Sequence, residues 1–189
     1  MNNSALQEIL KSYFPALDKG EINTIVKHSS YLKSPKGTKL ISEGERHKYF
    51  YLLLKGGVKA YFFKNTKKVC MWFSFENEMI GTISMLQGDA SKETIELLED
   101  SELIKFNTEK MEELSQTCFS LKTIRDNLLK EDIKWFEERV RQSQFTNSNE
   151  RYEALIKHTP EILQRVSLTD IASYIGVSRE TLSRIRSRK

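Results

Sequence analysis

The chain has 189 residues, with 30 Lys and Arg against 26 Asp and Glu and a formal net charge of +4 at pH 7. This length suits one domain or two small ones. Two cysteines are too few for a disulfide framework, and no apolar run is long enough to span a bilayer, so disulfide scaffolds and membrane-spanning proteins are excluded. With no signal peptide at the N-terminus, we expect a cytoplasmic protein.

Residues 35–106 alternate short apolar runs with Gly, Pro and charged residues, a pattern typical of a β-sheet domain. The runs are rich in aromatic and branched side chains, which suit a half-buried pleated surface. We predict strands over Thr38–Ser42, Tyr49–Leu54, Val58–Phe63, Lys68–Phe75, Glu93–Leu98 and Ser101–Phe106.

A long helix is predicted over Phe119–Gln144, where apolar residues recur at helical spacing. One stripe repeats every seven residues, at Leu121, Leu128 and Trp135. Two adjacent stripes exceed what one packing face needs, so one can cover the β-domain while the other meets a partner helix. A single broad face buried within one subunit is the alternative. The second stripe consists of Leu129, Ile133, Phe136 and Val140.

A polar break at residues 146–149 follows the long helix and indicates a hinge. The next segment, Glu150–His158, is amphipathic, and Ser148 or Asn149 is expected to cap it. Thr159-Pro160 ends this helix, because the residue before proline is pushed out of helical backbone space.

Residues 166–186, VSLTDIASYIGVSRETLSRIR, have the pattern of a helix-turn-helix. Ser167 with Asp170 three residues later predicts a capped helix start. Gly176 is expected to stop that helix, since glycine readily adopts the left-handed backbone of a sharp exit. Ser178 can cap a second helix whose Leu182 and Ile185 face inward.

The face opposite Leu182 and Ile185 carries Arg179, Glu180 and Arg184, with Ser183 beside them. Arg can bond guanine bidentately and Glu can accept from the cytosine amino group, so this face suits base reading in a major groove. The last twelve residues hold five Lys or Arg and one Glu, which equals the whole net charge of +4. The alternative is a solvated helix on which Glu180 and Arg184 only pair with each other.

The string SRETLSRI closely resembles the recognition-helix pattern S-R-E-T-V-G-R-I of catabolite activator protein-like members of the CRP/FNR superfamily of bacterial transcription regulators. Residues 35–62 resemble the start of the β-roll of that family, with Gly37, Gly44 and Gly56 at its turns. Residues 150–186 resemble a subgroup common in Bacteroidetes. The resemblance covers nearly all of the chain.

The resemblance implies an α+β protein with three parts: an N-terminal β-roll (a cyclic-nucleotide-binding-like jelly roll) over residues 1–117, a dimerisation helix over residues 118–145, and a winged-helix-like helix-turn-helix domain over residues 146–189. Any wing would lie within residues 159–167. The implied partners are double-stranded DNA, a second copy of the chain and RNA polymerase. A symmetric dimer would present two recognition helices about 34 Å apart to a pseudo-palindromic site.

The resemblance also assigns roles to residues. Arg179, Glu180 and Arg184 would read bases in half-sites similar to TGTGA, and Leu121, Leu128 and Trp135 would lie on the dimer helix. Phosphate and positioning contacts would come from Ser167, Thr169, Ser178, Thr181, Ser183, Arg186, Arg188 and Lys189.

The phosphate-binding cassette of cyclic AMP-binding relatives is degenerate here. Gly81 matches, but Thr82 replaces the ribose-binding Glu, Lys92 replaces the Arg, and Glu93 replaces the Ser. Lys lacks the bidentate fork of Arg, and an ionised Glu would repel a phosphate. We therefore expect no usual cyclic AMP site, no metal site and no cofactor. An unidentified effector in this pocket and a roll that serves only as a scaffold remain alternatives.

No phosphate loop, nucleophile motif or suggestive carboxylate pair is present, so the sequence predicts no enzyme. Cys70 and Cys118 cannot supply the thiolates of an iron–sulfur cluster and are expected to be buried thiols. The alternative to a DNA-binding regulator is a small-molecule-binding or protein-interaction module whose basic C-terminal helix contacts another acidic partner. That alternative leaves the helix-turn-helix pattern unexplained.

Overall fold

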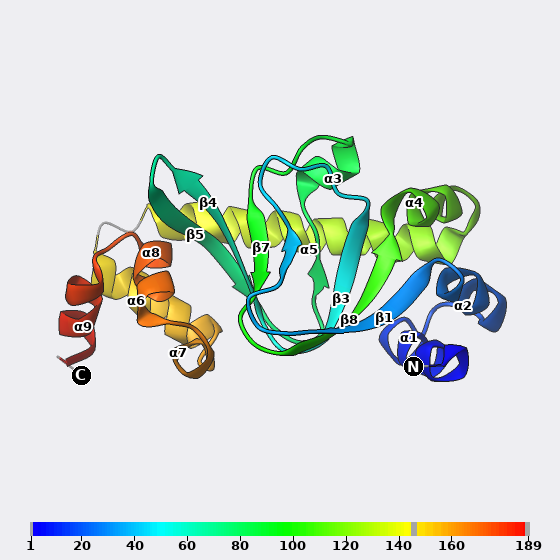
Figure 1. Ribbon diagram of the computed structural model, residues 1–189, viewed down its shortest axis with the longest axis horizontal. Coiled ribbons are helices and arrows are strands. Elements are labelled where there is room, and N and C mark those ends of the chain that lie inside the picture. Colours follow the sequence, from blue (N-terminus) through cyan, green and yellow to red (C-terminus); the bar gives the residue numbers. More distant parts are fainter. Residues whose placement is uncertain (1, 145–146, 188–189) are drawn as a thin grey trace.

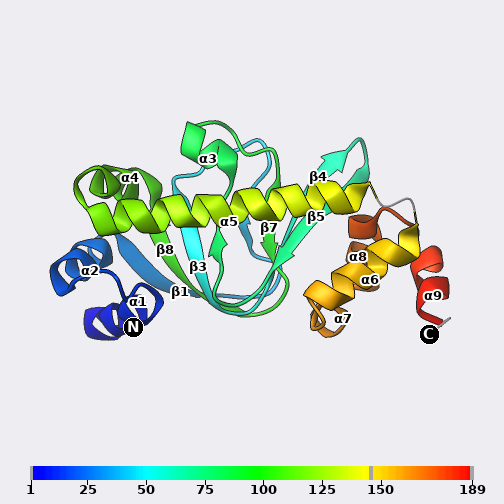
Figure 2. The same cartoon turned by 180° about the vertical axis from the view of Figure 1, so that it is seen from behind.

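The computed structural model describes residues 2–144 and 147–187. Two four-stranded antiparallel sheets form a roll in the middle of the molecule, and a long helix runs across its back (Figures 1 and 2). The first sheet has the order β1-β8-β3-β6 and the second the order β2-β7-β4-β5. The strands are β1 (Ser29–Ser34), β2 (Lys39–Ile41), β3 (Tyr49–Lys55), β4 (Val58–Lys64), β5 (Lys67–Ser74), β6 (Met79–Ile80), β7 (Thr94–Leu97) and β8 (Ser101–Asn107).

The helices lie before, within and after the roll. They are α1 (Asn3–Tyr13), α2 (Lys19–Val26), α3 (Ile83–Gln87), α4 (Thr108–Thr117), α5 (Phe119–Ser143), α6 (Ser148–His158), α7 (Ile162–Arg165), α8 (Leu168–Ile175) and α9 (Arg179–Ser187). The chain therefore has the predicted α+β architecture, with a roll, a long helix and a C-terminal helical part.

The six predicted strands are all present, within one or two residues of their expected ends. Gly37, Gly44 and Gly56 lie at turns with φ of +83°, +84° and +107°, the left-handed region that glycine adopts without strain. A side chain at Gly56 would also collide with Ser101, whose Oγ lies 2.1 Å from the Cβ position. These turns let consecutive strands fold back into the roll.

Three hydrophobic clusters hold the parts together. The first lies between the two sheets and includes Ile41, Leu53 and Ile95. The second lies between the first sheet and helices α1, α2 and α4, and includes Leu10 and Ile25. The third is the core of the C-terminal helices.

The third cluster extends into the roll. It joins the C-terminal residues Ile162, Ile171 and Leu182 to Phe75 and Leu98, which follow strands of the second sheet. Because one cluster spans both parts, the C-terminal helices are packed onto the roll rather than tethered by the hinge alone.

Several elements were not predicted. Helices α1, α2, α3, α4 and α7 and strands β1 and β6 come in addition to the predicted set. Asn147, rather than Ser148 or Asn149, caps α6. Thr146 of the predicted hinge lies outside the described residues.

The expected place for a wing contains a helix. Residues 159–167 hold α7, and its Ile162 is 1% exposed in the C-terminal core. Burial of this side chain favours a helical turn there over an extended hairpin, and the described residues 147–187 contain no strand.

Candidate nucleic-acid interface

Helices α8 and α9 form the predicted helix-turn-helix, which lies at one end of the molecule (Figure 1). Ser167 caps α8: its Oγ accepts a hydrogen bond from the Asp170 backbone N–H at 3.1 Å. Gly176 ends α8 with φ of +76°, and the Val177 N–H donates to the Ala172 carbonyl at 2.9 Å. This turn reverses the chain directly into α9, as the sequence predicts.

Helix α9 buries one face and exposes the other. Leu182 and Ile185 are 0% and 7% exposed in the core shared with α8. The Ser178 Oγ caps the helix by accepting from the Thr181 N–H at 3.1 Å. On the outer face, the exposed residues are Arg179, Glu180, Ser183, Arg184 and Arg186.

The charged side chains on this outer face are exposed to solvent. The pKa of Glu180 is lowered by its own backbone N–H at the helix N-terminus and by the Ser178 hydroxyl, so the carboxylate is ionised at neutral pH. Among the residues that the structure describes, no ion pair joins Glu180 to Arg184. The charges of Arg179 and Arg184 nevertheless also lower the pKa of Glu180, so Glu180 and Arg184 interact without forming an ion pair.

The predicted phosphate-contacting residues differ in their surroundings. Thr169 is exposed, whereas the Ser167 hydroxyl already donates to Asp170 Oδ2 at 2.9 Å. The hydroxyls of Ser178 and Thr181 lie 3.1 Å apart, at the N-terminus of α9. Arg188 and Lys189 lie outside the described residues.

Asp170, on the first turn of α8, binds the roll instead of the solvent. Its side chain is 6% exposed and its oxygens lie 3.1 Å from Lys59 Nζ and 2.8 Å from Lys68 Nζ, on strands β4 and β5. Burial opposes ionisation, but the hydrogen bonds from Lys68 and Ser167 and the charge of Lys59 outweigh it and lower the pKa of Asp170 to about 2. The Cys70 thiol donates to the same carboxylate at 3.4 Å.

Ser173 adds a backbone connection one turn later on α8. Its hydroxyl accepts from the Cys70 N–H and donates to the Lys68 carbonyl, both at 3.0 Å. Cys70 is 3% exposed, and burial followed by the nearby Asp170 charge raises the pKa of its thiol to about 12. Cys70 is therefore the buried thiol that the sequence predicts, whereas Cys118 is only half-buried.

Three arginine side chains make further hydrogen bonds that involve the C-terminal helices. Arg165 on α7 bonds Glu76 at 2.7 and 2.8 Å and also bonds Glu99, and its guanidinium hydrogen bonds lower the pKa of Glu76 to about 2. Arg139 on α5 donates to the Tyr174 carbonyl at 3.0 Å, and Arg151 donates to the Ile175 carbonyl at 2.8 Å. These last two bonds satisfy carbonyls at the C-terminus of α8, where positive charge is favoured.

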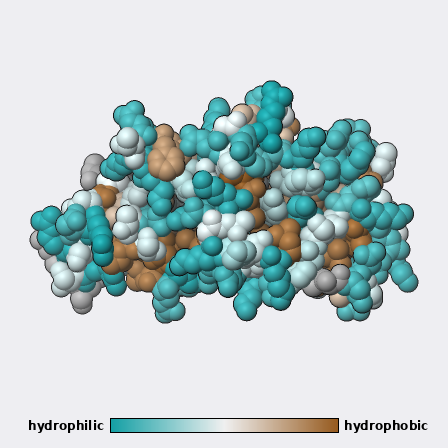
Figure 3. Space-filling model, in the orientation of Figure 1, coloured by the Kyte–Doolittle hydropathy of each residue, from teal (hydrophilic) through white to brown (hydrophobic). Residues whose placement is uncertain are grey.

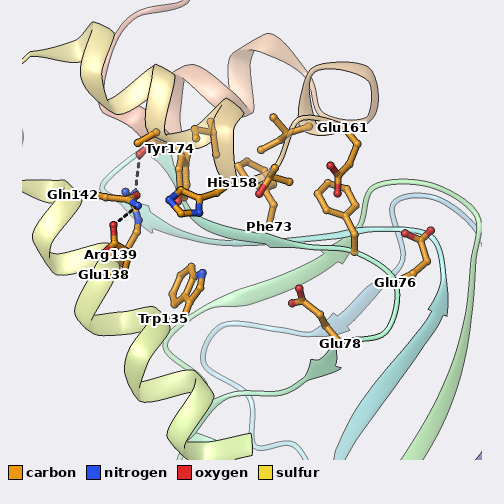
Figure 4. Close-up of a pocket in the computed structure, with 15 residues that line it drawn as sticks. Phe73, Glu76, Glu78, Trp135, Glu138, Arg139, Gln142, His158, Glu161 and Tyr174 are labelled. Atoms are coloured by element: carbon orange, nitrogen blue, oxygen red, sulfur yellow. Dashed lines mark hydrogen bonds between the residues drawn. The ribbon is translucent and has the colours of Figure 1, made fainter. Parts of the chain in front are cut away.

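A cavity of about 380 Å³ lies between the end of β5, α5 and α6 (Figure 4). Phe73 and Tyr174 line it from the roll and from α8, and their rings are 5.4 Å apart. Trp135 projects into it from α5. One member of the seven-residue stripe therefore lines a cavity of its own chain, although 41% of its surface is exposed.

The two apolar stripes of α5 have different surroundings. Leu121 packs against the N-terminal cluster and Trp135 lines the cavity, so the first stripe is partly used within the chain. In the second stripe, Ile133 and Val140 expose 65% and 63% of their surface. The opposite face of the molecule is mostly hydrophilic (Figure 3). The second stripe is thus the more available of the two.

The degenerate cassette is built around α3. Gly81 approaches Phe50 and Met85 closely, since a Cβ there would lie 3.1 Å from Met85 Cε. Thr82 is 7% exposed and its hydroxyl caps α3 by accepting from the Met85 N–H at 3.3 Å. Lys92 is exposed, whereas Glu93 is half-buried and its pKa is raised by burial.

Neither Lys92 nor Glu93 can bind a phosphate as the Arg and Ser of cyclic AMP-binding relatives would. One carboxyl oxygen of Glu93, Oε2, is buried with no hydrogen-bond partner among the described residues. When ionised, the Glu93 carboxylate would repel a phosphate, and when protonated it could donate one hydrogen bond. Lys92, the next residue in the chain, lies at the surface. The two cavities described in the molecule lie elsewhere, against α5 and α8.

Residues 31–118 match the family model described as the cyclic nucleotide-binding domain. The roll is therefore similar to a cyclic nucleotide-binding domain. The match covers the roll together with α4, and thus includes the cassette around α3. No curated protein matches the chain.

Solved structures share the fold of the cyclic nucleotide-binding domain together with the C-terminal helices. A protein from Eubacterium rectale described as a transcriptional regulator of the CRP/FNR family has a TM-score of 0.76 at 16% identity, covering 94% of this chain and 87% of its own. FixK2 from Bradyrhizobium japonicum gives 0.71 at 17% identity over 85% and 83%. CLP from Xanthomonas campestris, described as a c-di-GMP-responsive global regulator, gives 0.68 at 17% over 90% and 91%.

These similarities confirm the fold class predicted from the sequence, because the chain has the same fold as these solved regulators. The closer likeness to a subgroup common in Bacteroidetes stays a prediction. Among the described residues, no helix is long and apolar enough to cross a membrane, and no group of three or more metal-binding side chains is present.

Proposed function

We propose that this chain is a dimeric transcription regulator that reads a pseudo-palindromic operator with α9. The outer face of α9 carries the proposal: Arg179, Glu180 and Arg184 are exposed together on a helix whose opposite side is locked into the core. Arg179 and Arg184 would bind guanine edges, and the ionised Glu180 would accept from a cytosine amino group.

Contacts to the DNA backbone would position this helix. Thr169 at the start of α8 and Ser183 and Arg186 on α9 are exposed beside the reading face. Ser167, Ser178 and Thr181 lie at helix N-termini, whose N–H groups favour phosphate oxygens. Arg188 and Lys189 belong to the same proposed set.

A second copy of the chain would pair along α5. The exposed Ile133 and Val140, with Leu129 and Phe136 at spacings of three and four, form a seam of the kind that two helices bury together. Removing these side chains from water supplies a reason to dimerise that packing within one chain does not. The first stripe, Leu121, Leu128 and Trp135, would then mainly support the seam from the side of the roll.

The proposed division of labour follows the three parts of the chain. Residues 1–117 would sense or support, residues 118–145 would dimerise, and residues 146–189 would bind DNA. Such a regulator acts on RNA polymerase at a promoter, in the cytoplasm, and performs no catalysis.

Cyclic AMP is not the proposed effector. The position of the ribose-binding acid holds Thr82, whose hydroxyl is used as a helix cap, and the half-buried Glu93 lies where a phosphate would need a donor. An effector of different chemistry could still use the cassette around α3, because Glu93 Oε2 is buried without a hydrogen-bond partner among the described residues.

The test is selection of bound sequences from a random DNA pool by the full chain, with no added effector. We expect an enriched palindrome with half-sites similar to TGTGA, bound by two chains. A matched selection with the Glu180→Ala, Arg184→Ala double variant should lose the enrichment while the protein remains folded and dimeric. Equal recovery of random and selected DNA by the unaltered chain would contradict the proposal and favour a module for another acidic partner.

A further inference from the structure

The hairpin of β4 and β5 extends beyond the rest of the roll and ends in a basic turn (Figure 1). Lys64 and Lys67 face each other across the two-residue loop Asn65-Thr66. Asn65 has φ of +57°, a conformation that asparagine tolerates and that tight hairpin loops require. The turn is thus a compact, well-defined structure.

This hairpin is attached to the helix-turn-helix. Lys59 and Lys68 bind Asp170 of α8, and the Ser173 hydroxyl bridges two backbone groups of β5. Wherever α8 is placed, the hairpin turn is placed with it. The association uses buried polar groups, which makes its geometry specific.

Two lysines of the hairpin take part in the attachment to α8, and two others do not. Lys59 and Lys68 are balanced by Asp170 and by Glu96, which lies 3.2 Å from Lys59. Lys64 and Lys67 are exposed, and no ion pair of the described residues includes them. The turn therefore carries two positive charges that form no ion pair with the described residues.

The hairpin and α9 lie on either side of the surface that α8 would turn toward DNA. With 3.6 residues per helical turn, the exposed Thr169 falls between Ala172 and Ser173 around α8. Ala172 faces the core shared with α9, whereas Ser173 faces the hairpin. In Figure 1 the hairpin turn lies above α8, and α9 lies below it and to the left.

We propose that the β4–β5 turn is a second DNA contact, in which Lys64 and Lys67 bind backbone phosphates outside the bases read by α9. The inference rests on the proposed function of α9. The C-terminal part has no strand of its own among residues 147–187, so the roll supplies the wing that residues 159–167 do not. Two exposed amines on a compact turn suit phosphates, which are recognised by charge rather than by sequence.

Binding of this kind has a defined thermodynamic signature. Each phosphate neutralised by a lysine releases condensed counterions, and the slope of log K against log[salt] changes by about 0.9 per contact. Loss of the turn should therefore weaken binding to cognate and random DNA by the same factor. It should also flatten the salt dependence.

The experiment compares the full chain with its Lys64→Gln, Lys67→Gln double variant on the selected operator, embedded in long or short flanking DNA. We expect roughly ten-fold weaker binding on long flanks, a salt slope smaller by about 0.9 or more, and no difference on short flanks. Hydroxyl-radical footprints should lose protection outside the half-sites. The Lys64→Arg, Lys67→Arg variant, which keeps the charge, should restore both.

A Lys19→Gln, Lys27→Gln double variant is the matched control, because both lysines are exposed on α2 or at its end, at the opposite end of the molecule (Figure 1). It should leave affinity and salt slope unchanged. If the unaltered chain binds its operator and the hairpin variant matches it in every measurement, the turn is not a DNA contact and an acidic protein partner replaces it. If the unaltered chain selects no DNA, the proposed function of α9 fails first.

Discussion

Helices α8 and α9 begin in similar ways, yet their polar sides have opposite surroundings. Each follows a serine cap, and each carries an acidic residue in its first turn, Asp170 and Glu180. The polar side of α8 is buried against the roll, where Asp170 is 4% exposed, whereas the polar side of α9 is open to solvent. The same sequence signal therefore attaches one helix to its own chain and leaves the polar side of the next helix exposed to solvent.

The largest expected effect comes from removing the acid of α8. Asp170→Ala leaves Lys59 and Lys68 without their shared carboxylate, and breaking a buried pair by removing one partner costs about 3 kcal/mol or more of unfolding free energy. Denaturant unfolding measures this change.

Glu180→Ala is the matched change on α9. Its side chain is exposed, so the free energy of unfolding should change by less than about 0.5 kcal/mol while operator binding falls. Similar unfolding curves for the two variants would remove the distinction between the helices.

Acid should weaken the α8 attachment by an intermediate amount. The folded pKa of Asp170, about 2, lies below its ordinary value of about 4, so its contribution is complete above that ordinary value and is lost as the pH falls toward 2. A shift of this size corresponds to about 2 kcal/mol. We expect unfolding free energy measured from pH 5 to pH 2 to fall less steeply in Asp170→Asn than in the unaltered chain.

Glu76, whose pKa is also lowered to about 2 by Arg165, contributes in the same direction and remains in both proteins. The comparison between the two acid profiles therefore isolates Asp170. Parallel profiles would mean that the ion cluster on α8 does not contribute to stability.

Arg184→Ala should cost roughly 1–3 kcal/mol of binding free energy on the selected operator and relax the preference at one base pair. Arg186→Ala, a proposed phosphate contact on the same helix, should weaken binding to all sequences alike. Competition binding with single-base operator variants separates the two. Identical base preferences in both variants would argue against base reading by Arg184.

Much of the fold could be predicted because local signals are strong. The strands of the second sheet have branched and aromatic runs bounded by glycine turns, and the helix-turn-helix has a serine cap, Gly176 and a second serine cap. The predicted long helix ends at Gln144, one residue beyond its observed end at Ser143. Such features depend on neighbours in the sequence and need no knowledge of the tertiary structure.

Some missed elements had a readable signal. Helix α2 begins with a capping box in which Asp18 and Glu21 satisfy each other's backbone N–H groups, and Ile22, Ile25 and Val26 follow at helical spacing. Strand β1 had none, since SSYLKS is polar and only half-buried. Strand β6 has two residues, too few for any periodicity.

The exposed polar face of α9 could be predicted, but the surroundings of α8 could not. Asp170 meets Lys59 across 111 positions of sequence and Cys70 across 100. A serine–aspartate pair at this spacing predicts a local cap, and that cap is present. Its second role as an anchor on the roll depends on tertiary packing, which no local pattern encodes.

The Ser173 bridge has a further consequence for solubility. Strand β5 is the outer strand of its sheet, and the outer strand of a sheet offers unpaired backbone groups to any other extended chain. The Ser173 hydroxyl occupies two of those groups, at Lys68 and Cys70, with α8 lying over them. The C-terminal helices thus also shield the roll from edge-to-edge aggregation.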